Sequence, residues 1–479
     1  MNEEKELVKA KREKLARLQQ TVKDAKLPVL VMVEGWGAAG KGTLISCLIR
    51  DLDPRYFKVF TTKPATKEEK RKPFLWRYVE KVPESGKFVF MDAGWTDEVV
   101  EAKVKNPQNK GKYEKKVESI RILERQLADN GYLILKFFLD ISKKEQKKRL
   151  GRLMEDKDKK WRVDDRDLMQ LKHHEKFEEA YRTFINDTDS DVAPWHIINM
   201  GNEKEVEYQV CSLLVDEITL AVSKNKIPAS GLKKDFPLRK MPLLSEVNLS
   251  QSLSREEYEK ELNACQKRIG ELQNKLYRYR IPVIIGYEGW DAAGKGGNIK
   301  RLTSGMDARG FEVHPIAAPE PHEKNRFYLW RFWKRLPKTG HIAIFDRTWY
   351  GRVMVERLEG FCEEEEWRRA YTEINEFEQE LSNWGAIVMK FWIHIDKDTQ
   401  LKRFNARKND PDKQWKLTDE DWRNREKWDA YEEAANDMLQ KTSTECAPWH
   451  IIESNDKLYA RIKVMKLVIS AMEKKLKEL

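Results

Sequence analysis

Two ten-residue segments, which start 254 positions apart, share eight of their ten residues, and this repeat constrains the fold more than any other feature. The first reads EGWGAAGKGT from Glu34, and the second reads EGWDAAGKGG from Glu288. Other landmarks keep the same offset without insertion, including Asp92 with Asp346 and the APWHII segment that recurs at 447–452. A period of this length indicates a duplicated domain rather than a short structural repeat.

The chain of 479 residues is long enough for two domains, each with a complete core. We expect a first domain at 1–222 and a second at 254–479. Residues 223–253 are rich in proline, serine and lysine, which predicts a linker between the two domains.

Charged residues make up 36% of the chain, and the formal net charge is +11. This balance favours a polyanionic partner such as a nucleotide, a phosphate polymer or nucleic acid. No apolar run approaches the ~20 residues of a membrane-spanning helix, and the N-terminal segment lacks the apolar core of a signal peptide. We therefore expect no membrane partner and a cytoplasmic location.

In each half, a helical pattern leads into a continuous apolar run, at 28–33 and 282–287, and then into the glycine-rich segment. Such a run is typical of a central parallel strand that is buried on both faces. Further strand-like runs, separated by helical stretches, lie at 311–317, 342–345, 386–395 and 449–452. The alternation predicts an α/β fold in each half, with a parallel sheet flanked by helices. Ser254 and Glu257 have the spacing of a capping box, which predicts the start of a helix.

A strand, the pattern G-x-x-x-x-G-K and a helix together turn successive backbone N–H groups toward phosphate oxygens. The second copy meets this description from Gly289 to Lys295, and the lysine is expected to reach the transferred group. The residue after the lysine is Gly296, where a hydroxyl side chain would usually ligate magnesium. The candidate phosphate-binding residues are Gly289, Ala292, Ala293, Gly294, Gly296 and Gly297, with Lys300 and Arg301 on the next helix.

Two aspartates can supply the missing metal ligand. Asp291 lies inside the loop, where a carboxylate would repel phosphate unless a cation such as Mg²⁺ lay between them. Asp346 ends an apolar strand, at the position where P-loop enzymes hold their metal. The sequence therefore predicts a magnesium ion at Asp291 and Asp346.

Several arginines and lysines follow these acids. Arg347 and Arg352 lie one and six residues after Asp346, and charge of this kind offsets that of phosphate oxygens. A basic, proline-broken segment at 409–416 is typical of a mobile lid, for which the candidates are Arg403, Lys413 and Lys416, with Arg407 one helical turn after Arg403. Arg331 belongs to a third basic set that would extend a phosphate track, and its neighbours Trp330 and Trp333 are expected in the core.

Three segments, at 288–297, 345–352 (FDRTWYGR) and 409–416 (NDPDKQWK), together resemble the polyphosphate kinase-2 family across essentially the whole second half. The resemblance implies a thymidylate-kinase-like P-loop fold in each half, with a helical lid, and magnesium-dependent transfer of phosphate between inorganic polyphosphate and nucleotides. It implies that Asp291 and Asp346 hold magnesium and that the transferring group is stabilised by Lys295, Arg347, Arg352 and Arg407. The two-domain form is similar to the subgroup that makes ADP from AMP with its second domain.

The first half lacks several of these charges. Asp291 is matched by Gly37, Arg347 by Ala93, Arg352 by Glu98 and Arg407 by Leu153. Because it keeps Lys41 and Asp92, the first half is predicted to retain weak phosphate binding without turnover.

Two other functions share part of this pattern. An ATP-dependent nucleoside monophosphate kinase would have the same loop, and a non-catalytic scaffold that binds polyanions would have the same positive charge. The glycine after the lysine, the paired acids and the basic track favour a polymeric phosphate donor such as inorganic polyphosphate. The resemblance implies AMP as the acceptor, and no specific nucleic acid partner is expected. We also expect a homo-oligomer.

Overall fold

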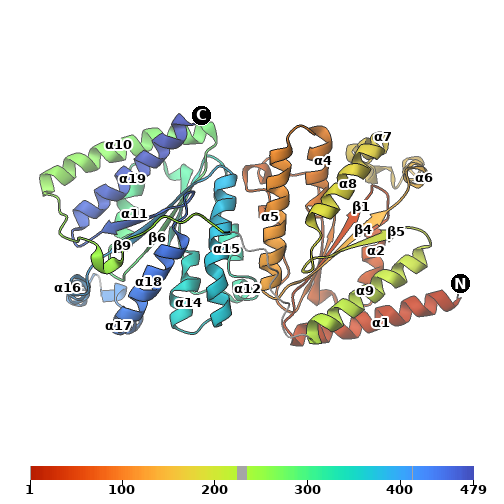
Figure 1. Cartoon of the computed structure of the whole chain (residues 1–479), viewed down its shortest axis with the longest axis horizontal. Coiled ribbons are helices and arrows are strands. Elements are labelled where there is room, and N and C mark those ends of the chain that lie inside the picture. Colours follow the sequence, from red (N-terminus) through yellow and green to blue (C-terminus); the bar gives the residue numbers. More distant parts are fainter. Residues whose placement is uncertain (1, 224–234, 413) are drawn as a thin grey trace. The chain divides into compact units, whose positions relative to one another are not determined.

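The computed structural model describes residues 2–223, 235–412 and 414–479. The chain forms two compact units (Figure 1). The first comprises Met1–Thr66, Phe74–Leu232 and Glu320–Trp330, and the second comprises Lys67–Pro73, Lys233–Pro319 and Arg331–Leu479. The predicted domain boundaries stay a prediction, and residues 224–234 of the predicted linker lie outside the described residues.

The first unit is built on five parallel strands in the order β2-β3-β1-β4-β5. The strands are β1 Val29–Gly35, β2 Phe57–Thr61, β3 Phe88–Asp92, β4 Leu133–Asp140 and β5 Trp195–Asn199. The helices are α1 Asn2–Asp24, α2 Lys41–Leu48, α3 Trp76–Val79, α4 Thr96–Lys105, α5 Lys110–Asp129, α6 Lys143–Glu155, α7 Asp165–Lys172, α8 His174–Thr188 and α9 Glu203–Ser223. Helix α1 packs along α9 (Figure 1).

The second half of the chain repeats this order, with strands arranged β7-β8-β6-β9-β10. The strands are β6 Val283–Gly289, β7 Phe311–Pro315, β8 Ile342–Asp346, β9 Ile387–His394 and β10 Trp449–Glu453. The helices are α10 Arg255–Tyr279, α11 Lys295–Thr303, α12 Pro321–Lys324, α13 Trp330–Lys334, α14 Val355–Leu358, α15 Glu364–Asn383, α16 Lys397–Lys408, α17 Asp419–Glu426, α18 Trp428–Thr442 and α19 Lys457–Lys477, and α10 packs along α19.

The predicted parallel sheets flanked by helices are confirmed. The expected central strand at 282–287 is β6, whose side chains are buried over most of its length. The capping box is also confirmed, because the Ser254 hydroxyl accepts from the Glu257 N–H at 3.2 Å and the Glu257 carboxylate accepts from the Ser254 N–H at 3.0 Å. None of the helices in the described ranges is long and apolar enough to cross a membrane.

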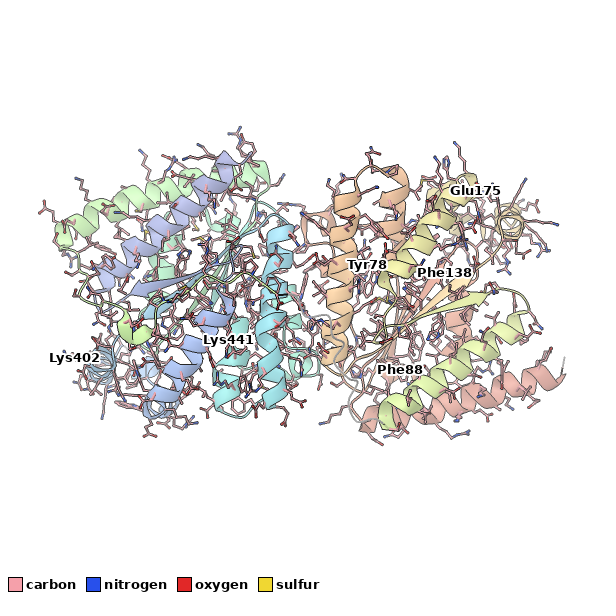
Figure 2. All side chains as sticks on the ribbon, viewed as in Figure 1. Tyr78, Phe88, Phe138, Glu175, Lys402 and Lys441 are labelled. Atoms are coloured by element: carbon pink, nitrogen blue, oxygen red, sulfur yellow. The ribbon has the colours of Figure 1, made fainter. Side chains whose placement is uncertain are left out.

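Burial follows the chemistry of the side chains (Figure 2). Tyr78, Phe88 and Phe138 lie in the core of the first unit, whereas charged side chains such as Lys402 and Lys441 face solvent. Trp330 and Trp333 are buried, at 4% and 3% exposure, so the prediction that both belong to the core is confirmed.

Each unit also buries one lysine–glutamate pair at the same place in its sheet. In the first unit, the Lys136 ammonium on β4 donates to both Glu124 oxygens at 2.9 Å and to the Thr188 carbonyl at 2.9 Å. In the second, the Lys390 ammonium on β9 donates to Glu378 at 2.7 Å and to the Thr442 carbonyl at 2.7 Å. Burial raises the pKa of Glu378 and lowers that of Lys390.

The pair in the second unit also holds the chain that follows β8. Glu378 accepts hydrogen bonds from the Trp349 indole N–H at 3.0 Å and from the Tyr350 hydroxyl at 2.8 Å. Lys390 donates to the same Tyr350 oxygen at 2.8 Å. Because Trp349 and Tyr350 lie two and three residues after the candidate site residue Arg347, this buried network fixes one wall of the site.

Replacement of Lys390 by methionine should lower the free energy of unfolding by about 3–5 kcal/mol, because it leaves the Glu378 carboxylate buried without its cation. The double variant Glu378→Gln/Lys390→Met should recover part of this loss, since no buried charge remains. Denaturant unfolding of both variants, and of the matched Glu124 and Lys136 variants in the first unit, measures the effect. Equal losses in the single and double variants would contradict the argument.

Candidate active site

The glycine-rich loop of the second unit connects β6 to α11 through a tight turn. Gly289 ends β6 at φ +138°, and a Cβ there would lie 2.3 Å from the Ile393 carbonyl oxygen, so glycine is required. Gly294 precedes α11 and lies in the left-handed region, with φ 114°. Its counterpart in the first unit, Gly40, has φ 103°. The Lys295 ammonium folds back and donates to the carbonyls of Gly289 at 2.6 Å and Trp290 at 3.2 Å. This is the strand–loop–helix geometry that the sequence predicts.

Arg403 supports the loop through hydrogen bonds to its backbone carbonyls. Its guanidinium on α16 donates to the carbonyls of Ala292 at 3.0 Å and Ala293 at 2.8 Å, and to those of Ser454 at 2.5 Å and Asn455 at 3.1 Å. Arg403 is predicted from the sequence to belong to a mobile lid, but in the structure it is bonded to backbone carbonyls of the loop and of the segment after β10. Arg403 is thus a positioning residue in this structure.

Asp291 and Arg347 meet at the mouth of the loop. The Arg347 guanidinium lies 3.4 Å from one Asp291 carboxylate oxygen, and the Asn424 amide of α17 donates to the other at 3.0 Å. Asp346 ends β8 in register with Tyr287 of β6, so it stands at the same edge of the sheet as the loop. The sequence analysis did not identify Asn424, because it follows Asp291 by 133 residues and lies on a separate helix.

Glu288, the first residue of the repeated motif, is a further residue that the sequence analysis missed as functional. Its buried carboxylate accepts from both the N–H and the hydroxyl of Thr348 at 2.7 Å, and burial raises its pKa. The first unit keeps the same contact, since Glu34 accepts from the Gly94 N–H at 2.7 Å. In each unit this glutamate bonds the central strand to the turn that follows the neighbouring strand. Its presence in both copies of the motif is the feature of the sequence that could have identified it.

Other predicted cations have protein partners. The Arg352 guanidinium is mostly buried and lies 3.2 Å from Glu356 and 3.8 Å from Glu366. Arg331 donates to the Ala317 carbonyl at 3.0 Å, and Arg301 donates to the Gly297 carbonyl at 3.3 Å. Lys300 is exposed on α11. Of the remaining lid residues, Lys416 lies in the short 3₁₀ turn Gln414–Lys416 and Lys413 lies outside the described residues.

Two cavities of opposite character flank the loop. The smaller, of about 80 Å³, has apolar and acidic walls; it is lined by Glu288, Gly289, Trp290, Asp291, Arg347, Gly351, Met354, Val355, Trp392, Gln400, Glu420, Asn424 and Tyr431. The larger, of about 310 Å³, has basic walls; it is lined by Ala292, Gly294, Gly297, Asn298, Arg403, Ala406, Arg407, Asp410, Ser454, Lys457, Ala460 and Arg461. The loop therefore separates an aromatic chamber from a cationic one, which we call the aromatic cavity and the basic cavity.

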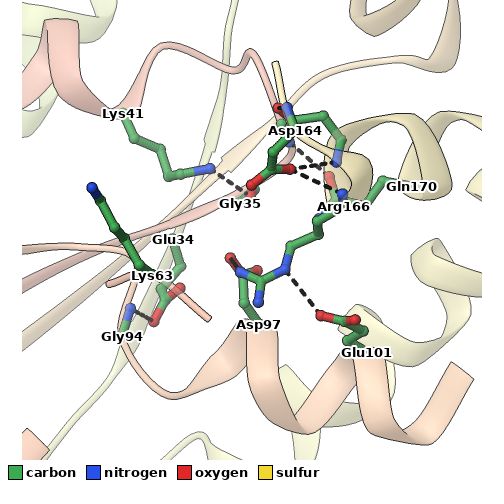
Figure 3. Close-up of polar contacts among 12 residues, drawn as sticks. Glu34, Gly35, Lys41, Lys63, Gly94, Asp97, Glu101, Asp164, Arg166 and Gln170 are labelled. Carbon is green, nitrogen blue, oxygen red and sulfur yellow. Dashed lines mark hydrogen bonds and ion pairs between the residues drawn. The ribbon is translucent and has the colours of Figure 1, made fainter. Parts of the chain in front are cut away.

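The corresponding place in the first unit is filled by charged side chains (Figure 3). The Arg166 guanidinium on α7 pairs with Asp97 and Glu101 on α4, each at 3.0 Å. The Gly37 N–H of the loop donates to the Gln170 side chain at 2.8 Å. A Cβ at Gly37 would lie 2.0 Å from an Asp167 carboxylate oxygen, so an aspartate at this position would require the Asp167 side chain of α7 to move.

Sequence comparison places both halves in one family. The model for "Polyphosphate kinase 2 (PPK2)" matches residues 1–226 and 252–479. The chain belongs to the polyphosphate kinase 2 family. It is 40% identical over 455 residues to a polyphosphate:AMP phosphotransferase of Pseudomonas syringae pv. tomato, covering 94% of this chain and 91% of the relative. A protein of Acinetobacter johnsonii with the same name is 36% identical and is covered to 91%.

A solved structure resembles this chain over its whole length. The crystal structure of a putative polyphosphate kinase 2 from Pseudomonas aeruginosa PA01 is 36% identical, and the alignment covers 100% of this chain and 97% of that chain with a TM-score of 0.86. An ADP-polyphosphate phosphotransferase of Pseudomonas aeruginosa is 39% identical over only 220 residues, or 46% of this chain. These relatives thus match either nearly the whole chain or about half of it.

The acidic cluster of the first unit makes its stability depend on pH. Burial, and then the nearby Asp97 carboxylate, raise the pKa of Glu34 from 4.5 to about 7. Between these two values the folded unit holds a proton that the unfolded chain has released, so stability falls as pH rises through this range and levels off above about 7.

Glu34→Gln should remove this decline, because glutamine stays neutral and its carbonyl oxygen can still accept from Gly94. The variant should gain up to ~3 kcal/mol relative to the parent protein between about pH 5 and about pH 8. Urea unfolding of the full chain at the two pH values measures the difference. A gain that is the same at both pH values would contradict the assignment.

Proposed function

We propose that this protein transfers a phosphate group from inorganic polyphosphate to AMP, forming ADP, at the site in its second unit. The observation that carries the proposal is the pair of cavities on either side of the loop. One is aromatic and the other is cationic, and they fit a nucleoside and a phosphate polymer respectively. The names of relatives that match nearly the full chain support the same substrates.

The aromatic cavity is suited to the nucleotide that accepts the phosphate. Trp290, Trp392 and Tyr431 line this cavity and give it the aromatic wall that suits a base, and Arg347 offers a cation to the AMP phosphate. Glu420 and Asn424 of α17 close one side of this cavity, and its present volume of about 80 Å³ is small for a nucleotide. Entry of AMP therefore requires α17 to move away, which gives this helix the role of a lid.

Asp291 and Asp346 fit a magnesium ion. Mg²⁺ is commonly held by one or two carboxylates together with phosphate oxygens and water, and Gly296 leaves no hydroxyl ligand at the usual position. When bound, the metal would offset charge on the phosphate oxygens. Asn424 and Arg347 hold the two oxygens of Asp291 and so orient its carboxylate.

The chain's own residues act mainly by position and charge. The bond from the terminal phosphorus of polyphosphate to its bridging oxygen breaks, the shortened polyphosphate leaves with the electron pair, and an oxygen of the AMP phosphate bonds to that phosphorus. Lys295 lies across the loop where the transferred group would sit, and Arg347 and Arg407 approach from the two cavities. Such cations stabilise charge that spreads over the phosphate oxygens during transfer. Arg352, held by two glutamates, would contribute by packing the wall beside Arg347.

The first unit is proposed to be non-catalytic. It lacks the acid and arginines of the second unit, and Arg166, Asp97 and Glu101 occupy the place of the aromatic cavity. The weak phosphate binding expected from Lys41 would have to compete with Gln170 for the loop N–H of Gly37.

The reaction is tested with purified protein, AMP, Mg²⁺ and either polyphosphate or ATP as the donor. ADP formed from polyphosphate without ATP, and lost on addition of a magnesium chelator, is the expected result. Turnover with ATP alone would favour a nucleoside monophosphate kinase. Binding of polyphosphate with no ADP formed from either donor would favour a scaffold.

The two loop lysines give a matched test of which unit works. Lys295→Ala should lower kcat by roughly two orders of magnitude or more, because the transferred group loses its closest fixed cation. Lys41→Ala makes the same change in the first unit and should leave kcat nearly unchanged. ADP formation is measured at equal concentrations of folded protein. Loss of turnover in folded Lys41→Ala, or its survival in Lys295→Ala, would refute the division of labour.

A further inference from the structure

The basic cavity extends beyond the loop to the start of α19, where two cations lie that no motif indicates. Lys457 is the first residue of α19 and Arg461 is one turn further along. They line the cavity together with Arg403 and Arg407. Among the described residues around this cavity, Asp410 is the one carboxylate and no side chain is aromatic. A phosphate polymer fits these walls, whereas a base and a sugar do not.

The degenerate first unit shows which of these cations the fold itself needs. At the offset of 254 residues, Arg403 corresponds to Arg149, whose guanidinium donates to the Ala39 carbonyl at 2.9 Å just as Arg403 donates to Ala293. A cation that supports the loop is therefore kept in both units. Arg407, in contrast, corresponds to Leu153.

At the start of the last helix the charge is reversed. Lys457 corresponds to Glu203, and Arg461 corresponds to Glu207, although α9 and α19 begin at equivalent positions and occupy the same place in their units. The fold thus accepts either sign of charge here. Two cations at this position serve something other than folding.

The geometry directs Arg461 toward the phosphate loop. A Cβ added at Gly297, in the first turn of α11, would lie 3.6 Å from an Arg461 guanidinium nitrogen and 3.9 Å from one of Arg301. Both guanidinium groups therefore converge on the turn that follows Lys295. In the first unit, Thr43 replaces Gly297 and Cys47 replaces Arg301.

These cations are close enough to repel one another. Burial, together with like-charge repulsion from Arg407 and Arg461, lowers the pKa of Arg403 to about 10. A bound polyanion would relieve this repulsion, because it brings negative charge among several fixed positive charges.

We propose that Lys457 and Arg461 form a tail subsite, which binds the part of the polyphosphate chain that extends past the phosphates in the loop. This inference rests on the proposed function and adds a basis for chain-length preference. A long donor contacts both the loop and the tail subsite, whereas a short donor fills the loop alone. The tail subsite should therefore strengthen binding of long chains without changing the chemical step.

The test uses the full-length protein with Lys457→Gln, with Arg461→Gln and with both. Binding of long-chain polyphosphate and of tripolyphosphate is measured by calorimetry without nucleotide, and kcat and KM are measured with each donor. Lys474→Gln removes an exposed charge near the far end of the same helix and is the control. Because Arg461 also donates to the Tyr258 hydroxyl at 3.4 Å, unfolding curves verify the fold, and Lys457→Gln tests the proposal without that contact.

Each substitution should weaken binding of long-chain polyphosphate by about tenfold, as expected for loss of one charge-assisted contact. For Lys457→Gln, affinity for tripolyphosphate, kcat and the KM for AMP should change by less than about twofold, and Lys474→Gln should have a similarly small effect on every measurement.

Three results would overturn the proposal: unchanged binding of long chains, equal weakening for long and short chains, or a rise in the KM for AMP in place of that for polyphosphate. Because binding is measured without nucleotide, the tail subsite can be judged even if no phosphate transfer from polyphosphate is found. Failure of the proposed function and failure of this inference are thus separate outcomes.

Discussion

Like charges held close together are the constraint on which the second unit depends. A site for a phosphate polymer needs several fixed cations around one loop, and in the free protein these cations repel each other. In the proposed site of the second unit, Arg403 donates to four backbone carbonyls and so supports the shape of the loop. Its lowered pKa reflects both burial and its neighbours Arg407 and Arg461. Arg403 thus has a structural role, whereas Arg407 and Arg461 line the basic cavity.

The duplication separates structural residues from functional ones within a single chain. Both units keep the buried lysine–glutamate pair and the glutamate that begins the repeated motif. In each unit the lysine donates to its glutamate, and the motif glutamate accepts from the N–H at the equivalent position of the neighbouring turn. The positions that differ gather around the loop: Asp291 against Gly37, Arg407 against Leu153, and Arg461 against Glu207. Agreement marks what the fold requires. Residues that differ between the two units are those that a ligand would require. This contrast supports both the proposed active unit and the tail subsite.

Much of the fold could be predicted from local sequence patterns, whereas the site could be predicted only in part. The apolar runs gave the parallel strands and Ser254 with Glu257 gave a helix start, because burial and capping are read from neighbours in sequence. Asn424 could not be found in this way, since its partner Asp291 is 133 residues away. Arg352 was expected beside the phosphates, but glutamates on α14 and α15 hold it, and the sequence alone does not show which acids a helix will bring near. Lys457 and Arg461 were visible only as a charge reversal between the halves.

The first unit illustrates the other solution to the same electrostatic problem. Its Arg166 finds compensation inside the protein, in Asp97 and Glu101, and its loop N–H at Gly37 is bonded to Gln170. Because these groups already have partners within the protein, a phosphate ligand would have to replace existing interactions. The ion pairs of Arg166 also hold α7 against α4. The second unit has Gly351 and Val355 in place of Asp97 and Glu101. Helix α17 therefore lacks the ion pairs that hold α7 in the first unit, and a cavity remains. Function at a polyanion site therefore requires interactions that the folded chain leaves for its substrate to complete.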